Sequence, residues 1–261
     1  IVMDAGSRNR PIVPGLTTMV IDHHRPEGVP PVDVFVTSYE VEPQAPASLL
    51  TYHVCQAFAP DDGEAWLAAV GTIADLGPKV DFEVVREARA RFGLKALTET
   101  ASLVNAARRA PEHDIATAFG ALVGADNPLD VVQGGVPETV VLQRYRREVN
   151  SELRRVMRTA PRMSGEWALL RFSSPALVHP LVAIAWTRRL SNSIVVAANE
   201  GYTEGNVHFS VRSAKDVDLP EALRKIRPVA PDTEFAHGHR EATGGIVTVG
   251  EFEEIAKAMG F

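Results

Sequence analysis

The sequence predicts an α/β fold in which a parallel-sheet domain and a smaller α/β domain are joined by a linker helix. Three observations support this prediction. Short apolar runs alternate with helical patterns in residues 1–127, an amphipathic pattern follows within 128–163, and a shorter alternation starts again in 164–261. Alternation of strands and helices is typical of a sheet that is covered by helices.

The first domain, 1–127, contains three apolar runs that are typical of short buried strands, at 1–3, 18–21 and 32–36. Helical patterns occupy 47–58, 62–71, 81–92 and 112–123. Because the two kinds of segment alternate, we expect a parallel sheet with helices on its faces.

The segment 128–163 is predicted to connect the two domains. Asn127-Pro128 and Gln133-Gly134-Gly135-Val136-Pro137 interrupt the chain. After them, apolar residues recur every three or four positions, at Val141, Tyr145, Val149, Leu153 and Val156. This spacing predicts an amphipathic helix. Its many arginines form a solvated face or contact nucleic acid, and the sequence leaves both interpretations open.

The second domain, 164–261, is predicted to be a smaller α/β unit. Strands are expected at 167–172, 193–198 and 207–211. Helices are expected at 179–190, 217–226 and 250–259, with a Gly-rich loop between the last two.

Polar residues follow several of the apolar segments. Asp22-His23-His24 ends the run Thr18-Met19-Val20-Ile21, Asp4 ends the first run, and Asp75 follows the apolar stretch from Trp66 to Val70. The carboxyl end of a strand in an open α/β sheet is a usual place for a site. Carboxylates and imidazoles gathered there make a metal site the first hypothesis.

The late loop reads Phe235-Ala236-His237-Gly238-His239-Arg240-Glu241-Ala242-Thr243-Gly244-Gly245. Its small residues would let a ligand approach the backbone beside an imidazole. A ligand-binding loop is therefore expected here.

The order of these motifs resembles that of the DHH phosphoesterases, and most closely their RecJ-like branch. The matching stretches are Asp4-Ala5-Gly6, Asp22-His23-His24, Gly71-Thr72-Ile73-Ala74-Asp75, Asn105-Ala106-Ala107-Arg108-Arg109, Arg212-Ser213 and Gly238-His239 with Gly244. The chain departs from the family pattern where Ala107-Arg108 lacks a glycine and where Ala236-His237 replaces two glycines. The resemblance covers nearly the whole chain and implies a DHH domain followed by a DHH-associated domain.

The resemblance also implies roles for residues. Asp4 would bridge two Mn²⁺ or Mg²⁺ ions, His23 and Asp75 would complete the shell of one ion, and Asp22 and His24 would act in catalysis beside them. The substrate would contact six residues of the second domain: Arg212, Ser213, Gly238, His239, Gly244 and Gly245. The alternatives are a helix-terminal or turn acid for Asp75, an exposed strand residue for Arg212 and a plain turn for Gly244-Gly245.

The activity implied by the resemblance is hydrolysis of a phosphodiester at the end of single-stranded DNA or RNA or of a short oligonucleotide, in the 5′ to 3′ direction, with the active site between the domains. One alternative is a phosphatase or phosphodiesterase on a small nucleotide, such as a nanoRNase, a bisphosphonucleotide phosphatase or a cyclic-dinucleotide hydrolase. Another is a non-catalytic single-strand-binding scaffold. The family's first metal motif should precede Asp4, so we expect the sequence to lack the first part of the sheet and the complete protein to hold two ions.

Composition sets outer limits. The 261 residues include 45% hydrophobic and 23% charged residues, which is typical of a globular enzyme. The net charge of −6 argues against a globally basic nucleic-acid-binding protein. A single cysteine, Cys55, rules out an internal disulfide. We find no apolar run long enough to span a membrane and no signal peptide, so a cytoplasmic protein is expected.

Overall fold

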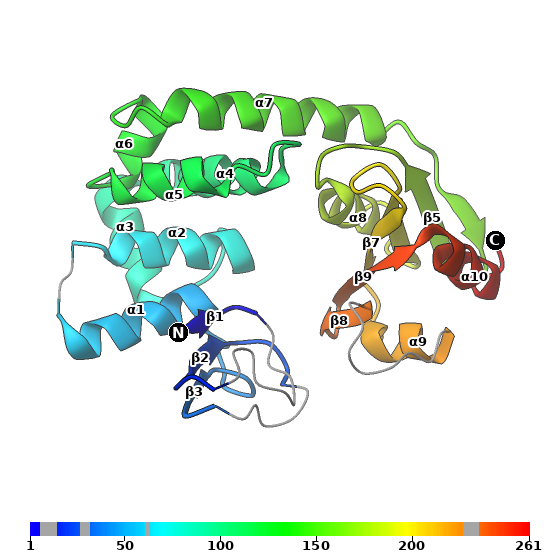
Figure 1. Cartoon of the computed structure of the whole chain (residues 1–261), viewed down its shortest axis with the longest axis horizontal. Helices are drawn as coiled ribbons and strands as arrows, with labels where there is room; N and C mark the ends of the chain where they lie inside the picture. The colour runs from blue at the N-terminus through cyan, green and yellow to red at the C-terminus, as the bar shows by residue number, and fades with distance from the viewer. Residues whose placement is uncertain (6–14, 27–31, 61–62, 227–234) are drawn as a thin grey trace. The chain divides into compact units, whose positions relative to one another are not determined.

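The computed structural model describes residues 1–5, 15–26, 32–60, 63–226 and 235–261, with residues 237–239 described by their backbone alone. The chain divides into two compact units (Figure 1). The first comprises Ile1–Ala107 with Asp114–Arg144, and the second comprises Arg108–His113 with Tyr145–Phe261. The predicted α/β fold class is confirmed, because each unit combines helices with its own sheet.

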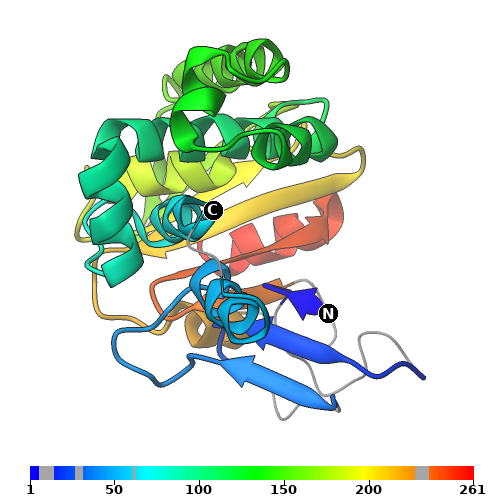
Figure 2. The ribbon, with the colours of Figure 1, turned by 90° about the vertical axis from the view of Figure 1, so that its left-hand side faces the viewer.

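The sheet of the first unit has three parallel strands in the order β1 (Val2–Met3), β2 (Met19–Asp22) and β3 (Val34–Thr37). They lie side by side in Figure 2. Val20 pairs with Val2 on one side and with Phe35 on the other. The side chains of Val20, Ile21 and Asp22 are at most 1% exposed, so β2 is buried on both faces. All three strands lie within a residue or two of the predicted runs.

The helices of the first unit begin with α1 (Ala47–Phe58), α2 (Ala65–Leu76), α3 (Glu83–Phe92) and α4 (Leu94–Arg109). They continue with α5 (Ile115–Val123), α6 (Pro128–Gln133) and the first part of α7 (Thr139–Val156). The helix α1 has the predicted bounds, whereas α2 begins later than predicted and extends to Leu76. The helices α4 and α6 are not among the predicted elements.

Local signals account for several helix ends. Gly93, with φ of +81°, separates α3 from α4. The Asp114 side chain accepts a hydrogen bond from the backbone of Thr117 at the start of α5. Asn127 and Asp130 form a capping box at the start of α6, with Pro128 in its first turn. The Asn-Pro pair that is expected to interrupt the chain therefore starts a short helix.

The amphipathic helix α7 runs from the first unit into the second. Leu142, Tyr145, Val149 and Val156 are buried along one face. The division between Arg144 and Tyr145 falls inside the segment that the sequence assigns to the connecting helix. The domain limits at 127 and 164 stay a prediction.

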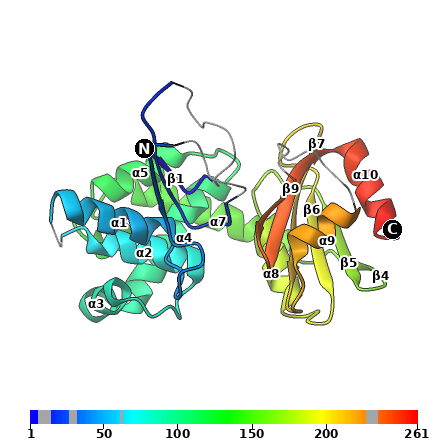
Figure 3. The same ribbon diagram turned by 90° about the horizontal axis from the view of Figure 1, so that it is seen from below.

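The sheet of the second unit has six strands in the order β4-β5-β6-β7-β9-β8. The strands are β4 (Arg162–Ser164), β5 (Trp167–Phe172), β6 (Ile194–Asn199), β7 (Asn206–Ser213), β8 (Phe235–His239) and β9 (Ala242–Thr248). Only the pair β5–β6 is parallel among these neighbours. The helices are α8 (His179–Thr187), α9 (Leu219–Ile226) and α10 (Val249–Ala258) (Figure 3). The Phe209 ring packs against those of Phe235 and Phe252, with centroids 5.9 and 5.6 Å apart.

The prediction of a Gly-rich loop between the last two helices is wrong, because 235–248 contains the hairpin β8–β9. Gly244 pairs with Ser210 of β7 and with His237 of β8. A Cβ atom on Gly244 would overlap the carbonyl oxygen of Phe209. The glycine is therefore required for the close approach of two strands.

No helix within the described ranges combines the length and the apolar composition that a membrane crossing needs.

Candidate metal centre

The parallel pairing of β1 and β2 places Asp4 beside Asp22. Met3 pairs with Ile21, and the N–H of Asp4 donates to the carbonyl oxygen of Ile21 at 3.0 Å. Asp4 itself has φ of +57°, a left-handed conformation that is uncommon for a residue other than glycine. Both carboxylates thus occur at the carboxyl edge of the sheet, as the sequence predicts.

His23 is the centre of the cluster. Its side chain is 3% exposed, and its Nε2 lies 3.2 Å from Asp4 Oδ1 and 3.7 Å from Asp75 Oδ2. The Gln44 side-chain amide donates a hydrogen bond to the His23 carbonyl oxygen. The ring nitrogen therefore lies between two carboxylates, one directly after β1 and the other in the last turn of α2.

Asp75 reaches the cluster from the last turn of α2, so it is not a residue that follows the helix. The alternative of a helix-terminal acid describes its position correctly, yet its carboxylate is directed to His23. The approach of α2 to α1 depends on Gly71, where a Cβ atom would overlap the side chain of Ser48. Helix packing through Gly71 thereby sets the position of Asp75.

Asp22 forms the buried base of the cluster and is fully buried. Its Oδ1 accepts hydrogen bonds from His24 Nδ1 at 2.7 Å, from the His23 N–H at 2.7 Å and from the His24 N–H at 3.0 Å. Its Oδ2 is buried and has no hydrogen-bond partner among the described residues. A buried polar atom without a partner is uncommon and points to a bound group that satisfies it.

The charges of the cluster follow from these contacts. The hydrogen bond with His23 holds the pKa of Asp4 below its ordinary value. Burial by itself would raise the pKa of Asp22, but the hydrogen bonds from His24 and His23 outweigh it and lower the pKa. The hydrogen bond to Asp22 raises the pKa of His24. These contacts thus favour the ionised form of Asp4 and Asp22 and the protonated form of His24.

The donor set fits a divalent cation. Asp4, His23 and His24 each offer a ligand atom, and these atoms lie within 4.8 Å of one another. Neighbouring ligands of one ion lie about 3.0–3.4 Å apart when the bonds are about 2.1 Å long. The 3.2 Å separation of Asp4 and His23 falls in this range, and the 3.7 Å separation of Asp75 and His23 is close to it.

His24 and Asp75 compete for the third place in this set. The Nδ1 of His24 lies 3.8 Å from Asp4 but only 2.7 Å from Asp22. A histidine whose Nδ1 donates to a carboxylate can still bind a metal ion through Nε2. The contacts therefore leave both His24 and Asp75 as candidates for the third ligand beside Asp4 and His23.

The substrate-binding residues that the sequence predicts lie in the second unit. Arg212 and Ser213 end β7, and Gly238, Gly244 and Gly245 lie in the hairpin β8–β9. The Nε of Arg212 is buried without a partner among the described residues, and burial lowers the pKa of this guanidinium. The Ser213 hydroxyl oxygen accepts a hydrogen bond from the N–H of Lys215.

Two predicted features lie outside the described part of the chain. These are Gly6 of the first motif and the side chain of His239. The cleft between the domains likewise stays a prediction.

Sequence patterns did not reveal Gln44, since a single amide ahead of a helix carries no recognisable spacing.

No protein-family model matches the chain, and no curated protein has significant sequence similarity to it. Among solved structures, the chain is similar to the pGpG-specific phosphodiesterase PggH from Vibrio cholerae, with 12% identity and a TM-score of 0.49, over 92% of this chain and 80% of that one. An exopolyphosphatase-related protein from Bacteroides fragilis has 13% identity and a TM-score of 0.41, over 94% of this chain and 64% of that one. An uncharacterized protein from Helicobacter pylori G27 has 13% identity and a TM-score of 0.28, over 93% of this chain and 74% of that one. At these identities and TM-scores the similarity carries no information about the chemistry of the site.

Proposed function

We propose that the chain is a metal-dependent phosphoesterase of the DHH type that hydrolyses a phosphodiester bond of a nucleotide substrate. The observation that supports this is the convergence of Asp4 and Asp75 on the ring nitrogen of His23, beside buried Asp22 and its hydrogen-bonded partner His24. These residues come from three separate elements, and carboxylates with imidazole are ligands that suit Mn²⁺. The order of motifs along the sequence supports the same proposal.

Asp4, His23 and Asp75 would hold the cation, which when bound supplies Lewis-acid polarisation of a phosphate and a water molecule of lowered pKa. Asp22 keeps the proton of His24 on Nδ1 through the 2.7 Å hydrogen bond and so directs Nε2 away from itself. The same hydrogen bond raises the pKa of His24 and so favours the imidazolium form. In that form His24 can donate its Nε2 proton to an oxygen of the phosphate. Gln44 keeps the backbone of His23 in place.

In the second unit, Arg212 is the proposed phosphate ligand. Its buried Nε has no partner among the described residues, and a guanidinium forms two parallel hydrogen bonds with a phosphate. Ser213 and the backbone of the β8–β9 hairpin, with Gly238, Gly244 and Gly245, would line the substrate next to it. His239 belongs to the same proposal on the basis of the sequence motif.

The proposal is tested by metal binding and by hydrolysis together. Mn²⁺ binding is measured by electron paramagnetic resonance, and hydrolysis is measured with end-labelled DNA and RNA from dinucleotides to long oligonucleotides. His23→Ala should reduce both by about 100-fold or more. Asp81→Asn, which changes an exposed acid that pairs with Arg86, is the matched control and should change neither. A His23→Ala variant that binds Mn²⁺ as the parent chain does would contradict the ligand assignment.

The products identify the substrate class. The name of the Vibrio cholerae protein makes pGpG a suitable first substrate. Cleavage of dinucleotides alone would support a small-nucleotide phosphodiesterase, and stepwise shortening of long strands would support an exonuclease. Mn²⁺ binding without hydrolysis of any of these substrates would overturn the proposed enzyme in favour of a binding protein.

A further inference from the structure

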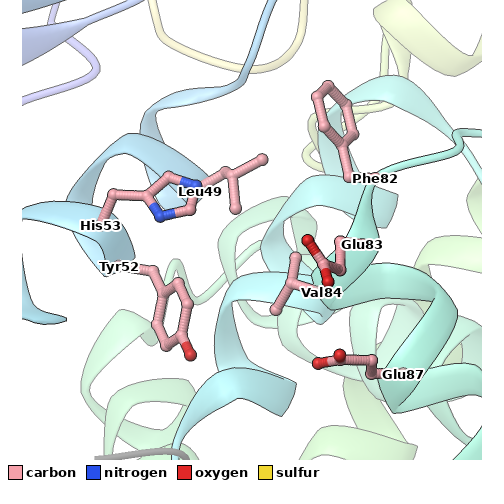
Figure 4. A pocket seen from close by; sticks show the side chains of 7 residues that line it. All are labelled: Leu49, Tyr52, His53, Phe82, Glu83, Val84 and Glu87. Carbon is pink, nitrogen blue, oxygen red and sulfur yellow. The ribbon is translucent and has the colours of Figure 1, made fainter. Parts of the chain in front are cut away.

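The first unit contains a second candidate ligand site, a pocket of about 330 Å³ between α1 and the start of α3 (Figure 4). This volume lies at the lower end of the range for small-molecule sites. Leu49 and Val84 are buried apolar residues of its lining. Tyr52, His53 and Phe82 add aromatic rings. The lining is therefore largely apolar and aromatic, which favours an organic ligand.

The remaining lining residues, Glu83 and Glu87, give the pocket negative charge. They are four residues apart on α3, so their carboxylates lie on one face of the helix and repel each other. Neither carboxylate has a hydrogen bond or an ion pair among the described residues. Of the arginines of α3, Arg86 attracts both carboxylates through its charge but forms its ion pair with Asp81, at 2.9 Å. Arg89 donates to the carbonyl oxygen of Pro78.

We propose that this pocket binds a small organic cation with an apolar body and an amine, amidinium or guanidinium head. The apolar body would lie against Leu49 and Val84, and the head would bind between Glu83 and Glu87. Tyr52 and Phe82 favour a cation further through their ring faces. A Ca²⁺ or Mg²⁺ ion fits poorly because it takes six or more oxygen ligands, and most of the lining has none to offer.

The pocket shares no residue with the His23 centre, so this proposal does not depend on the proposed function. It assigns a cation-binding site to α1 and α3, and an anionic nucleotide would be repelled from it.

The test uses benzamidine as the probe and benzamide, its uncharged analogue of the same shape, as the control ligand. Binding to the whole chain is measured by isothermal titration calorimetry and by ligand-detected nuclear magnetic resonance. Benzamidine should bind about tenfold or more tightly than benzamide, since one charged hydrogen bond is worth about 1.5 kcal/mol or more. Glu83→Gln with Glu87→Gln should weaken benzamidine binding by at least the same factor.

Glu254→Gln is the matched control variant, because Glu254 is an exposed glutamate of α10 that does not line the pocket. It should leave benzamidine binding unchanged. Both altered glutamates of the pocket are exposed, so the double variant should fold, and circular dichroism verifies this. Equal binding of benzamide, undiminished binding by the folded double variant, or no binding of benzamidine at all would each overturn the proposal.

Discussion

His179 should make the folded second unit less stable in acid. The side chain is 8% exposed at the start of α8, and its Nδ1 has no hydrogen-bond partner among the described residues. Its ring neighbours are His208 of β7, 5.9 Å away, and Tyr202, 6.2 Å away. Burial, together with the charge of His208, lowers the pKa of His179 to about 3.

The sign follows from proton linkage. In the unfolded chain a histidine has a pKa of about 6.5, so below this pH the unfolded state takes up a proton that the folded state excludes. The stability that depends on neutral His179 is therefore complete above about pH 6.5 and is lost progressively as the pH falls toward 3. Each pH unit below about 6.5 lowers the free energy of unfolding by about 1.4 kcal/mol. At about pH 5, one and a half units lower, the loss is therefore about 2 kcal/mol.

The assay compares the parent chain with His179→Leu, which keeps a side chain of similar volume but cannot be protonated. Urea unfolding is followed by tryptophan fluorescence in a Trp66→Phe background, so that the signal comes from Trp167 and Trp186 of the second unit. Between about pH 7.5 and pH 5, the parent should lose about 2 kcal/mol more free energy of unfolding than the variant. His53→Gln, at an exposed histidine of α1, should keep the full loss. Equal losses in the parent and in His179→Leu would refute the reasoning.

Three further substitutions test the packing and the site. Asp22→Asn removes the charge that accepts three hydrogen bonds from His23 and His24, and should weaken Mn²⁺ binding and hydrolysis by about 10- to 100-fold, measured by resonance titration and steady-state kinetics; unchanged Mn²⁺ affinity would contradict the role given to this carboxylate. Gly71→Ala places a Cβ against Ser48 and should lower the free energy of unfolding by about 1–3 kcal/mol, while Ser48→Gly in the same chain should restore it. Gly244→Ala should destabilise the second unit by a similar amount, about 1–3 kcal/mol in urea unfolding, because its Cβ meets the Phe209 carbonyl; a fully stable variant would leave ligand access as the reason for this glycine.

The sequence alone determined the elements whose signals are local. The apolar runs before Asp4 and Asp22 are strands, and α1 spans the predicted 47–58, because hydrophobic periodicity and chain breaks act over a few neighbouring residues. It also placed Asp4 beside Asp22, since parallel strands present their carboxyl ends at one edge of the sheet.

Tertiary structure decided what depends on contacts between distant segments. The stretch 235–248 has too many glycines to be recognised as strands. Its pairing with β7 depends on Gly244, because a Cβ atom at this position would overlap the carbonyl oxygen of Phe209. Asp75 belongs to the last turn of a helix, and only the packing of Gly71 on Ser48 brings it to His23. The pocket between α1 and α3 likewise joins two segments that are far apart in the sequence, with Leu49, Tyr52 and His53 on one side and Phe82 to Glu87 on the other. Such arrangements depend on side-chain packing in three dimensions, which local periodicity does not encode.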